Sequence, residues 1–304
     1  MKTKYFKIIF VFLLSILVIN CSDDKKETEN KDGRKTTETK NSKKENLNIS
    51  ILLDLSDRIN PKKYPNPTME YYQRDLGYIE TISKNFENHL KGKPIRQTDD
   101  QIQVFFEPEP LNLAINSLSK NLKLSFDKNN TSKENISKIS SVYRTNSTKI
   151  YKLAIADKNF DGANIWKFFK NKVKDYCIKN NHRNILIILT DGYIYHKDSK
   201  FTEGNKSSFI TPEFIREKKL NTSNYKEIFV KNNLGFIPAT QNLDNLEVIV
   251  IGINPSKKNP YEEEVINLYW ENWFKNMGIK KTYIKEADLP TNIGDVLENI
   301  ILNK

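Results

Sequence analysis

Four short runs of apolar, largely β-branched residues recur along the chain from residue 47 onward. They are Leu47–Leu53, Ile102–Phe106, Asn184–Leu189 and Leu246–Ile251. The last two are apolar at successive positions, without the alternation of a half-exposed strand, and this is typical of strands whose two faces are both covered. Two shorter runs, at 122–126 and 281–284, predict an alternating edge strand and a short last strand.

Helical periodicity fills the intervals between these strands. Apolar residues recur every three or four positions within 69–90, 165–177, 265–277 and 293–300, which is the spacing of amphipathic helices. Strands that alternate with helices predict an α/β fold with a doubly wound, mostly parallel sheet, here with one antiparallel edge strand. Ligands of such sheets bind at the carboxyl ends of the strands, so a site is expected there.

The segment 197–245 is a long insertion between two predicted strands. Thr211-Pro212-Glu213 predicts a helix start, because proline suits the first helical turn, and a second helix is expected near Ser223. The insertion could overhang the strand ends and select a partner. A surface decoration without a role is the alternative.

The first twenty residues carry a separate signal. Lysines within the first seven positions precede the run Ile8–Ile19, which is apolar except for Ser15. This run is too short for a comfortable transmembrane helix and is typical of a signal-peptide core. It ends in Val18-Ile19-Asn20-Cys21, which resembles the lipobox of bacterial lipoproteins. The resemblance implies a signal peptide at 1–20, cleavage before Cys21, and acylation of Cys21 that anchors the chain in membrane lipid.

Residues 22–46 contain no apolar side chain. Such a segment cannot bury surface, so residues 21–46 are expected to form a disordered, lipidated tether to a domain at 47–304. Ser22 beside the cysteine fits sorting of lipoproteins to the outer membrane. The acidic pair Asp23-Asp24 resembles signals that export some lipoproteins to the cell surface, so surface exposure is a second expectation.

Composition narrows the range of functions. Lysine and arginine outnumber acidic residues, 49 to 38, and the formal net charge of +11 falls to +8 without the signal peptide. The basic residues are spread along the chain and form no block that alternates with aromatics, so specific nucleic-acid binding is not expected. The three histidines lack zinc-site spacing. Cys177, the only other cysteine, is expected to be a small buried apolar group.

Acidic and hydroxyl residues follow two of the predicted strands. Asp54-Leu55-Ser56-Asp57-Arg58 follows the first strand, Thr190-Asp191-Gly192 follows a later one, and Asp161 precedes a helix between them. This arrangement, over residues 47 to about 302, resembles the von Willebrand factor type A domain. That family builds a metal-ion-dependent adhesion site from a DxSxS motif, a middle-loop threonine and a later aspartate. The resemblance implies a protein-binding module in which Asp54, Ser56 and Asp191 hold Mg²⁺ or Mn²⁺.

The motif departs from the family at two positions. Arg58 stands where the second serine belongs, and Ala163 stands where the threonine aligns. Three interpretations stay open. Asp57, Asp161 or Thr190 could complete a working metal site; the permanent charge of Arg58 could neutralise the carboxylates in place of a metal; or Asp54 and Asp191 could only cap loops and helix starts.

A tethered module that binds a protein or other macromolecular partner is the leading hypothesis, and the chain is not expected to be an enzyme. A phosphate-processing hydrolase is the alternative, because Asp54, Thr190 and Gly294-Asp295 resemble haloacid-dehalogenase motifs. That family has a second aspartate where Ser56 stands. A structural envelope-assembly lipoprotein is a third hypothesis.

Overall fold

The computed structural model describes residues 44–157 and 162–303. The predicted signal peptide, Cys21 and most of the predicted tether lie outside the described residues. Residues 44–304 form one compact unit, and both of its hydrophobic clusters are built from side chains between Leu47 and Ile301. This unit therefore carries a complete core of its own. In the described part of the chain, no helix is long and apolar enough to cross a bilayer.

Six strands form the central sheet, and its core strands follow the predicted apolar runs. The strands are β1 (Asn46–Leu53), β2 (Asp99–Phe105), β3 (Leu124–Asp127), β4 (His182–Leu189), β7 (Leu246–Ile253) and β8 (Lys281–Glu286). Their order is β3-β2-β1-β4-β7-β8, with β3 antiparallel and every other pair parallel. The predicted doubly wound, mostly parallel sheet with an antiparallel edge strand is confirmed, and it fits a von Willebrand factor type A-like architecture.

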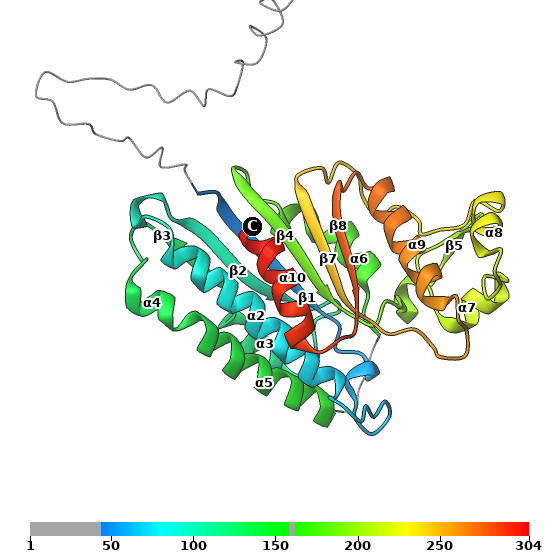
Figure 1. The fold of residues 1–304 in the computed structure, drawn as a ribbon, viewed down its shortest axis with the longest axis horizontal. Coiled ribbons are helices and arrows are strands. Elements are labelled where there is room, and N and C mark those ends of the chain that lie inside the picture. The colour runs from blue at the N-terminus through cyan, green and yellow to red at the C-terminus, as the bar shows by residue number, and fades with distance from the viewer. Residues whose placement is uncertain (1–43, 158–161, 304) are drawn as a thin grey trace, which may run out of the picture. The chain divides into compact units, whose positions relative to one another are not determined.

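Helices cover both faces of the sheet (Figure 1). One face carries α2 (Tyr71–Lys91), α3 (Leu113–Lys120), α4 (Lys133–Ser137), α5 (Ile139–Asp157) and α10 (Pro290–Leu302). The other face carries α6 (Ile165–Asn171), the π-helical turn η3 (Val173–Cys177) and α9 (Glu262–Asn276). Alternate residues of β1 supply the two layers, since Ile51 packs toward α2 and Leu52 toward α6. Cys177 is buried, as expected.

The insertion extends the layer that contains α9. It consists of η4 (Lys197–Ser199), β5 (Thr202–Glu203), β6 (Lys206–Ser207), α7 (Pro212–Glu217) and α8 (Tyr225–Lys231). The predicted helix start is confirmed, because the Thr211 hydroxyl caps α7 by accepting from the Phe214 amide. Phe236 at its far end packs on Tyr269 and Trp273 of α9, with ring centroids 5.2 Å apart in each pair. The insertion is thus joined to the core through aromatic side chains.

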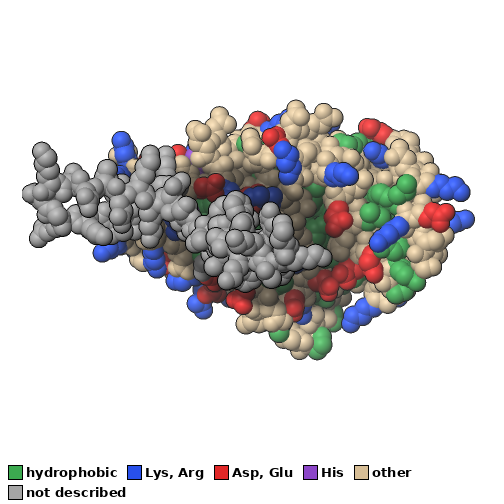
Figure 2. Space-filling view, turned by 45° about the horizontal axis from the view of Figure 1, so that its top comes forward, with side chains coloured by type: hydrophobic (Ala, Val, Ile, Leu, Met, Phe, Trp, Pro, Cys, Tyr) green, Lys and Arg blue, Asp and Glu red, His purple; other side chains and the backbone are tan. Residues whose placement is uncertain are grey.

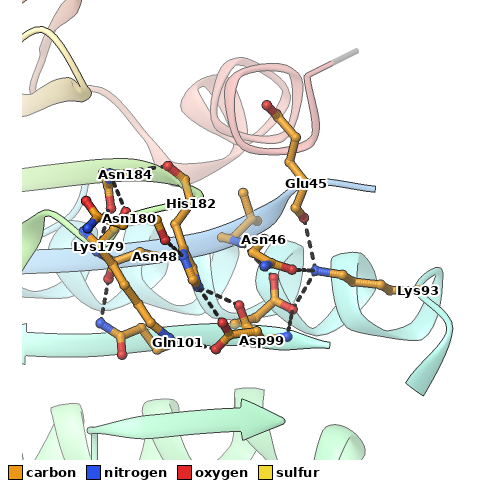
Figure 3. Close-up of polar contacts among 12 residues, drawn as sticks. Glu45, Asn46, Asn48, Lys93, Asp99, Gln101, Lys179, Asn180, His182 and Asn184 are labelled. Atoms are coloured by element: carbon orange, nitrogen blue, oxygen red, sulfur yellow. Dashed lines mark hydrogen bonds and ion pairs between the residues drawn. The ribbon is translucent and has the colours of Figure 1, made fainter. Parts of the chain in front are cut away.

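A polar layer lies at the amino ends of the central strands (Figure 3). The Asn48 amide donates to Asn184 Oδ1 at 2.7 Å and to the Cys177 carbonyl at 3.0 Å. Gln101 in turn donates to Asn48 Oδ1 at 2.7 Å. These side chains satisfy the carbonyl at the end of η3, which has no helical partner of its own. That requirement explains why an otherwise apolar strand carries an asparagine.

A buried ion pair fixes the start of β1 beside this layer. The Lys93 ammonium group, after α2, donates to Asp100 Oδ2 at 2.8 Å and to Asn46 Oδ1 at 2.6 Å. Asp100 also accepts from the Leu47 amide at 2.7 Å and lies 3.0 Å from His89 Nε2. Lys93 and Asp100 side chains have no exposed surface. The short helix η2 (Ile95–Gln97) separates the two partners.

The surface has no dominant charge on the face that Figure 2 displays. Lysine, arginine, aspartate and glutamate side chains are scattered there among uncharged ones. Several of the described lysines are paired with nearby carboxylates.

Candidate functional site

The site begins where β1 and β4 end side by side. Leu53 pairs with Leu189 in the parallel ladder, so the next residues, Asp54 and Thr190, emerge together. The Thr190 hydroxyl donates to Asp54 Oδ2 at 2.9 Å, and the Ser56 amide donates to Asp54 Oδ1 at 2.8 Å. Asp54 is 2% exposed. Both oxygens of its carboxylate are therefore occupied by hydrogen bonds within the protein.

Arg58 lies beneath these strand ends. It belongs to the short helix η1 (Asp57–Ile59), and it is 6% exposed. Its Nη2 donates to Asp75 Oδ2 of α2 at 2.7 Å and to the Leu189 carbonyl at 2.9 Å. Its Nε lies 3.4 Å from Asp54 Oδ2. The guanidinium of one arginine therefore contacts groups from β4, from α2 and from the residues directly after β1.

Asp75 has a second partner on another helix. The Tyr151 hydroxyl of α5 donates to Asp75 Oδ2 at 2.9 Å. Burial raises the pKa of Asp75, and Arg58 and Tyr151 partly offset that rise. Burial lowers the pKa of Arg58, but the carboxylates of Asp75 and Asp54 more than reverse this effect, so its pKa is raised. The guanidinium therefore stays charged at every accessible pH.

Asp191 completes the group on the outer side. It is half-buried, and its Oδ1 accepts from the Tyr193 amide at 3.1 Å. Burial and the neighbouring carboxylate of Asp54 raise the pKa of Asp191 to about 7, and Arg58 offsets only part of that increase. The cluster thus holds three carboxyl groups and one guanidinium, and Asp191 takes up a proton at a higher pH than an exposed aspartate does.

The structure brings together five of the predicted site residues and separates others. The five that meet at the strand ends are Asp54, Ser56, Arg58, Thr190 and Asp191. Asp57 forms an ion pair with Lys63 instead. Asp161 lies outside the described residues, and the half-buried Ala163 packs against the apolar core.

These residues do not fit a divalent cation as they stand. A hard cation needs several oxygen ligands, whereas the oxygens of Asp54 already accept two hydrogen bonds and one of these oxygens lies 3.4 Å from the Arg58 guanidinium. Across residues 44–157 and 162–303, no three acidic, histidine or cysteine side chains are grouped so as to hold a metal ion. The guanidinium of Arg58 adds positive charge at the same place.

Sequence reasoning missed Asp75 and Tyr151. A signal for Asp75 was present, because Asp75, Ile79, Ile82 and Phe86 follow one another at helical spacing on the buried side of α2. A carboxylate on an apolar stripe needs a buried partner. Tyr151 had no comparable signal, since tyrosines are common on buried helix faces.

Exposed apolar side chains occur in the segments that follow β1, β2 and β4. We define the strand-end face as residues 54–70, 106–113 and 190–199, the loops that follow β1, β2 and β4. Tyr64 is 42% exposed, Leu111 84%, Leu113 79% and Tyr195 43%. Asn164 links two of the loops, since its amide donates to the Glu107 carbonyl and its Oδ1 accepts from Ser199.

Comparison with known proteins gives only distant similarities. No protein-family model and no curated protein matches the chain. Among solved structures, the chain is similar to the pilus adhesin SpaC from Lactobacillus rhamnosus GG, with 11% identity and a TM-score of 0.37 over 87% of this chain and 30% of the adhesin. It is also similar to a D319A mutant of the PilB minor pilin from Streptococcus sanguinis, with 12% identity and a TM-score of 0.42 over 85% and 62% of the two chains.

A third similar structure is the conserved hypothetical protein BatB from Bacteroides thetaiotaomicron, with 10% identity and a TM-score of 0.39 over 85% of this chain and 100% of BatB. The chain spans less than two thirds of the adhesin and of the pilin. Similarity at this level does not assign a site or a partner to this chain.

Proposed function

We propose that this chain is a lipid-anchored binding module that engages a protein or other macromolecular partner through the strand-end face. One observation carries the proposal. Seven large hydrophobic side chains are exposed in the described part of the chain, and four of them, Tyr64, Leu111, Leu113 and Tyr195, belong to this face. Exposed apolar groups that gather around one site mark interaction surfaces, and tyrosine is enriched in such surfaces.

The first residues of the domain and the strand-end face lie at opposite ends of one strand. The chain enters the fold at Asn46, the first residue of β1, and the site begins directly after Leu53. The eight residues of this strand span about 26 Å. An acylated Cys21 in the outer membrane, exposed at the cell surface, would hold the chain by the amino edge of the sheet and leave the strand-end face free.

No specific observation favours the hydrolase alternative. A nucleophilic aspartate needs a free oxygen that faces a substrate, whereas Asp54 is buried and both of its oxygens accept hydrogen bonds. Asp295 lies within α10 and not at a strand end. A structural assembly lipoprotein would use the same face, so the identity of the partner separates that hypothesis from an adhesive role.

Paired substitutions test the proposal. Leu111→Ser with Leu113→Ser removes apolar surface that is already exposed, so the fold should be unchanged. We expect at least a tenfold loss of the partner complex from detergent-solubilised membranes, measured as the higher-mass species on native gels. Val230→Ser with Ile95→Ser is the matched control, because these side chains are 76% and 50% exposed away from the face. Loss of the complex in the control alone would reject the proposal.

A further inference from the structure

The Arg58 guanidinium lies among the polar groups where β1 and β4 end. It contacts the Asp54 carboxylate after β1, the Leu189 carbonyl of β4, and Asp75 of α2. We propose that Arg58 takes the place of the divalent cation that the sequence motif implies, so that the strand-end face is held together and works without a metal. The claim that a partner binds without a metal rests on the proposed function. The claim that Arg58 keeps a divalent cation out of the site does not.

The hydrogen bonds of Asp54 support this inference. Ser56 occupies Oδ1, and Thr190 and Arg58 share Oδ2. A cation at Oδ2 would have to share this oxygen with the Thr190 hydroxyl and come close to the Arg58 guanidinium. A hydroxyl can rotate away at little cost, but the guanidinium is fixed by its two bonds to Asp75 and Leu189, and it would repel the incoming charge.

The inner end of the arginine is anchored more firmly than its outer end. Nη2 has two partners at 2.9 Å or less, whereas Nε lies 3.4 Å from Asp54 and has no hydrogen-bond partner among the described residues. The Asp75–Tyr151 pair thus positions the Arg58 guanidinium from below. Arginine suits this role because its planar group is always charged and can satisfy several acceptors at once.

Replacement of a metal by Arg58 also changes what a partner must offer. A bound cation keeps coordination positions that a carboxylate of the partner can fill. Arg58 turns its shortest contacts inward and is 6% exposed. Its charge is already balanced by Asp54 and Asp75. A partner therefore needs no acidic group at this point, and recognition depends on the apolar side chains of the face.

Calorimetric titration of Mn²⁺ and Mg²⁺ into residues 44–304 tests the inference. We expect no saturable binding to the wild-type unit. Arg58→Ser restores the family's serine and should gain at least tenfold in Mn²⁺ affinity, and this gain should be lost again on Asp54→Asn. Arg58→Ser combined with Asp75→Asn removes both members of the buried pair, so it should fold even where an unpaired Asp75 prevents the single variant from folding. Arg96→Ser, on η2 at the opposite edge, is the control and should gain nothing.

Two results would overturn the inference. One is saturable binding to the wild-type unit that Asp54→Asn abolishes, and the other is the absence of any gain in both folded Arg58 variants. If neither variant folds, the wild-type titration decides alone: binding that depends on Asp54 refutes the inference, and its absence supports it. Because no partner enters these titrations, their outcome is independent of the proposed function.

Discussion

Single residues show where this fold is constrained most tightly. Gly252 lies in β7 beside the site with a φ of +108°, and a Cβ there would come 2.7 Å from the Thr190 carbonyl oxygen. Thr190 is the residue whose hydroxyl holds Asp54. The glycine is therefore needed both for its backbone conformation and for the close approach of β4.

A matched pair of alanine substitutions tests this constraint. Gly252→Ala should destabilise the domain by about 2–3 kcal/mol, because the backbone is strained and the neighbouring strand must move. Gly294→Ala, in the interior of α10 where nothing lies within 4 Å, should stabilise it by about 0.5–1 kcal/mol. Urea unfolding measures both. Equal effects in the two variants would contradict the role given to Gly252.

Glu87 carries a stability contribution that depends on pH. Burial raises the pKa of this α2 carboxylate, but hydrogen bonds from Lys91, Ser140 and Lys84 outweigh burial and lower the pKa from 4.5 to about 2. A carboxylate whose pKa is lowered by folding stabilises the folded state above its unfolded pKa and loses this contribution as the pH falls. Its stabilisation should therefore be complete above about pH 4.5 and disappear toward pH 2.

Glu87→Gln is the test of this dependence. The variant should be less stable than wild type by about 2 kcal/mol at pH 7, and the difference should shrink steadily between pH 4.5 and 2. Glu80→Gln, on the exposed side of the same helix, should change stability by less than 1 kcal/mol at every pH. A wild-type advantage that persists unchanged at pH 2 would show that the effect is not electrostatic.

At the scale of elements, the sequence predicts the buried strands well and the polar helices poorly. The run Ile185–Leu189 predicts a buried strand because it is short, apolar at successive positions and rich in β-branched isoleucine. In contrast, α5 was not predicted. Its buried stripe runs Ile139, Tyr143, Ser147, Ile150, Tyr151 and Ala154. Ser147 interrupts this stripe, and the helix as a whole is rich in serine, threonine and asparagine, which weaken the helical signal.

The same limit applies to the candidate site. Asp54, Ser56 and Asp191 could be predicted because residues after adjacent parallel strands meet at one edge of the sheet. Whether Arg58 would neutralise them could not be predicted. That outcome depends on Asp75 and Tyr151, which reach the site from two helices whose relative positions are set by packing. Separation along the chain leaves no local pattern for such contacts.

The buried pair at the start of β1 gives a prediction at this scale. Lys93→Met leaves Asp100 buried without its ammonium partner, and loss of one member of such a pair should cost about 3 kcal/mol. Lys91→Met, two residues away, removes a lysine that is 48% exposed in its pair with Glu87 and should cost under 1 kcal/mol. Denaturant unfolding compares them. A similar cost in both would mean that Lys93 does not fix the strand.

At the scale of the whole molecule, the two ends of the central strands differ in their exposed and buried side chains. At the amino ends of the strands, β1 begins at Asn46 and the polar side chains form hydrogen bonds with one another. The carboxyl edge buries a charged cluster under loops whose tyrosine and leucine side chains remain exposed. Such a division suits a module that is held at one end and binds at the other.

The most direct test of this division is a photo-crosslinking scan on intact cells. A photoreactive phenylalanine analogue is placed in turn at 64, 111 and 195 on the strand-end face, at 95 in η2, at 176 in η3, and at 230 in the insertion. We predict that one partner is crosslinked from the first three positions and not from the others, and that its yield is unchanged by a metal chelator. Crosslinks confined to 95, 176 or 230 would contradict the binding face, and yields at 64, 111 and 195 that vanish with the chelator would contradict its metal independence.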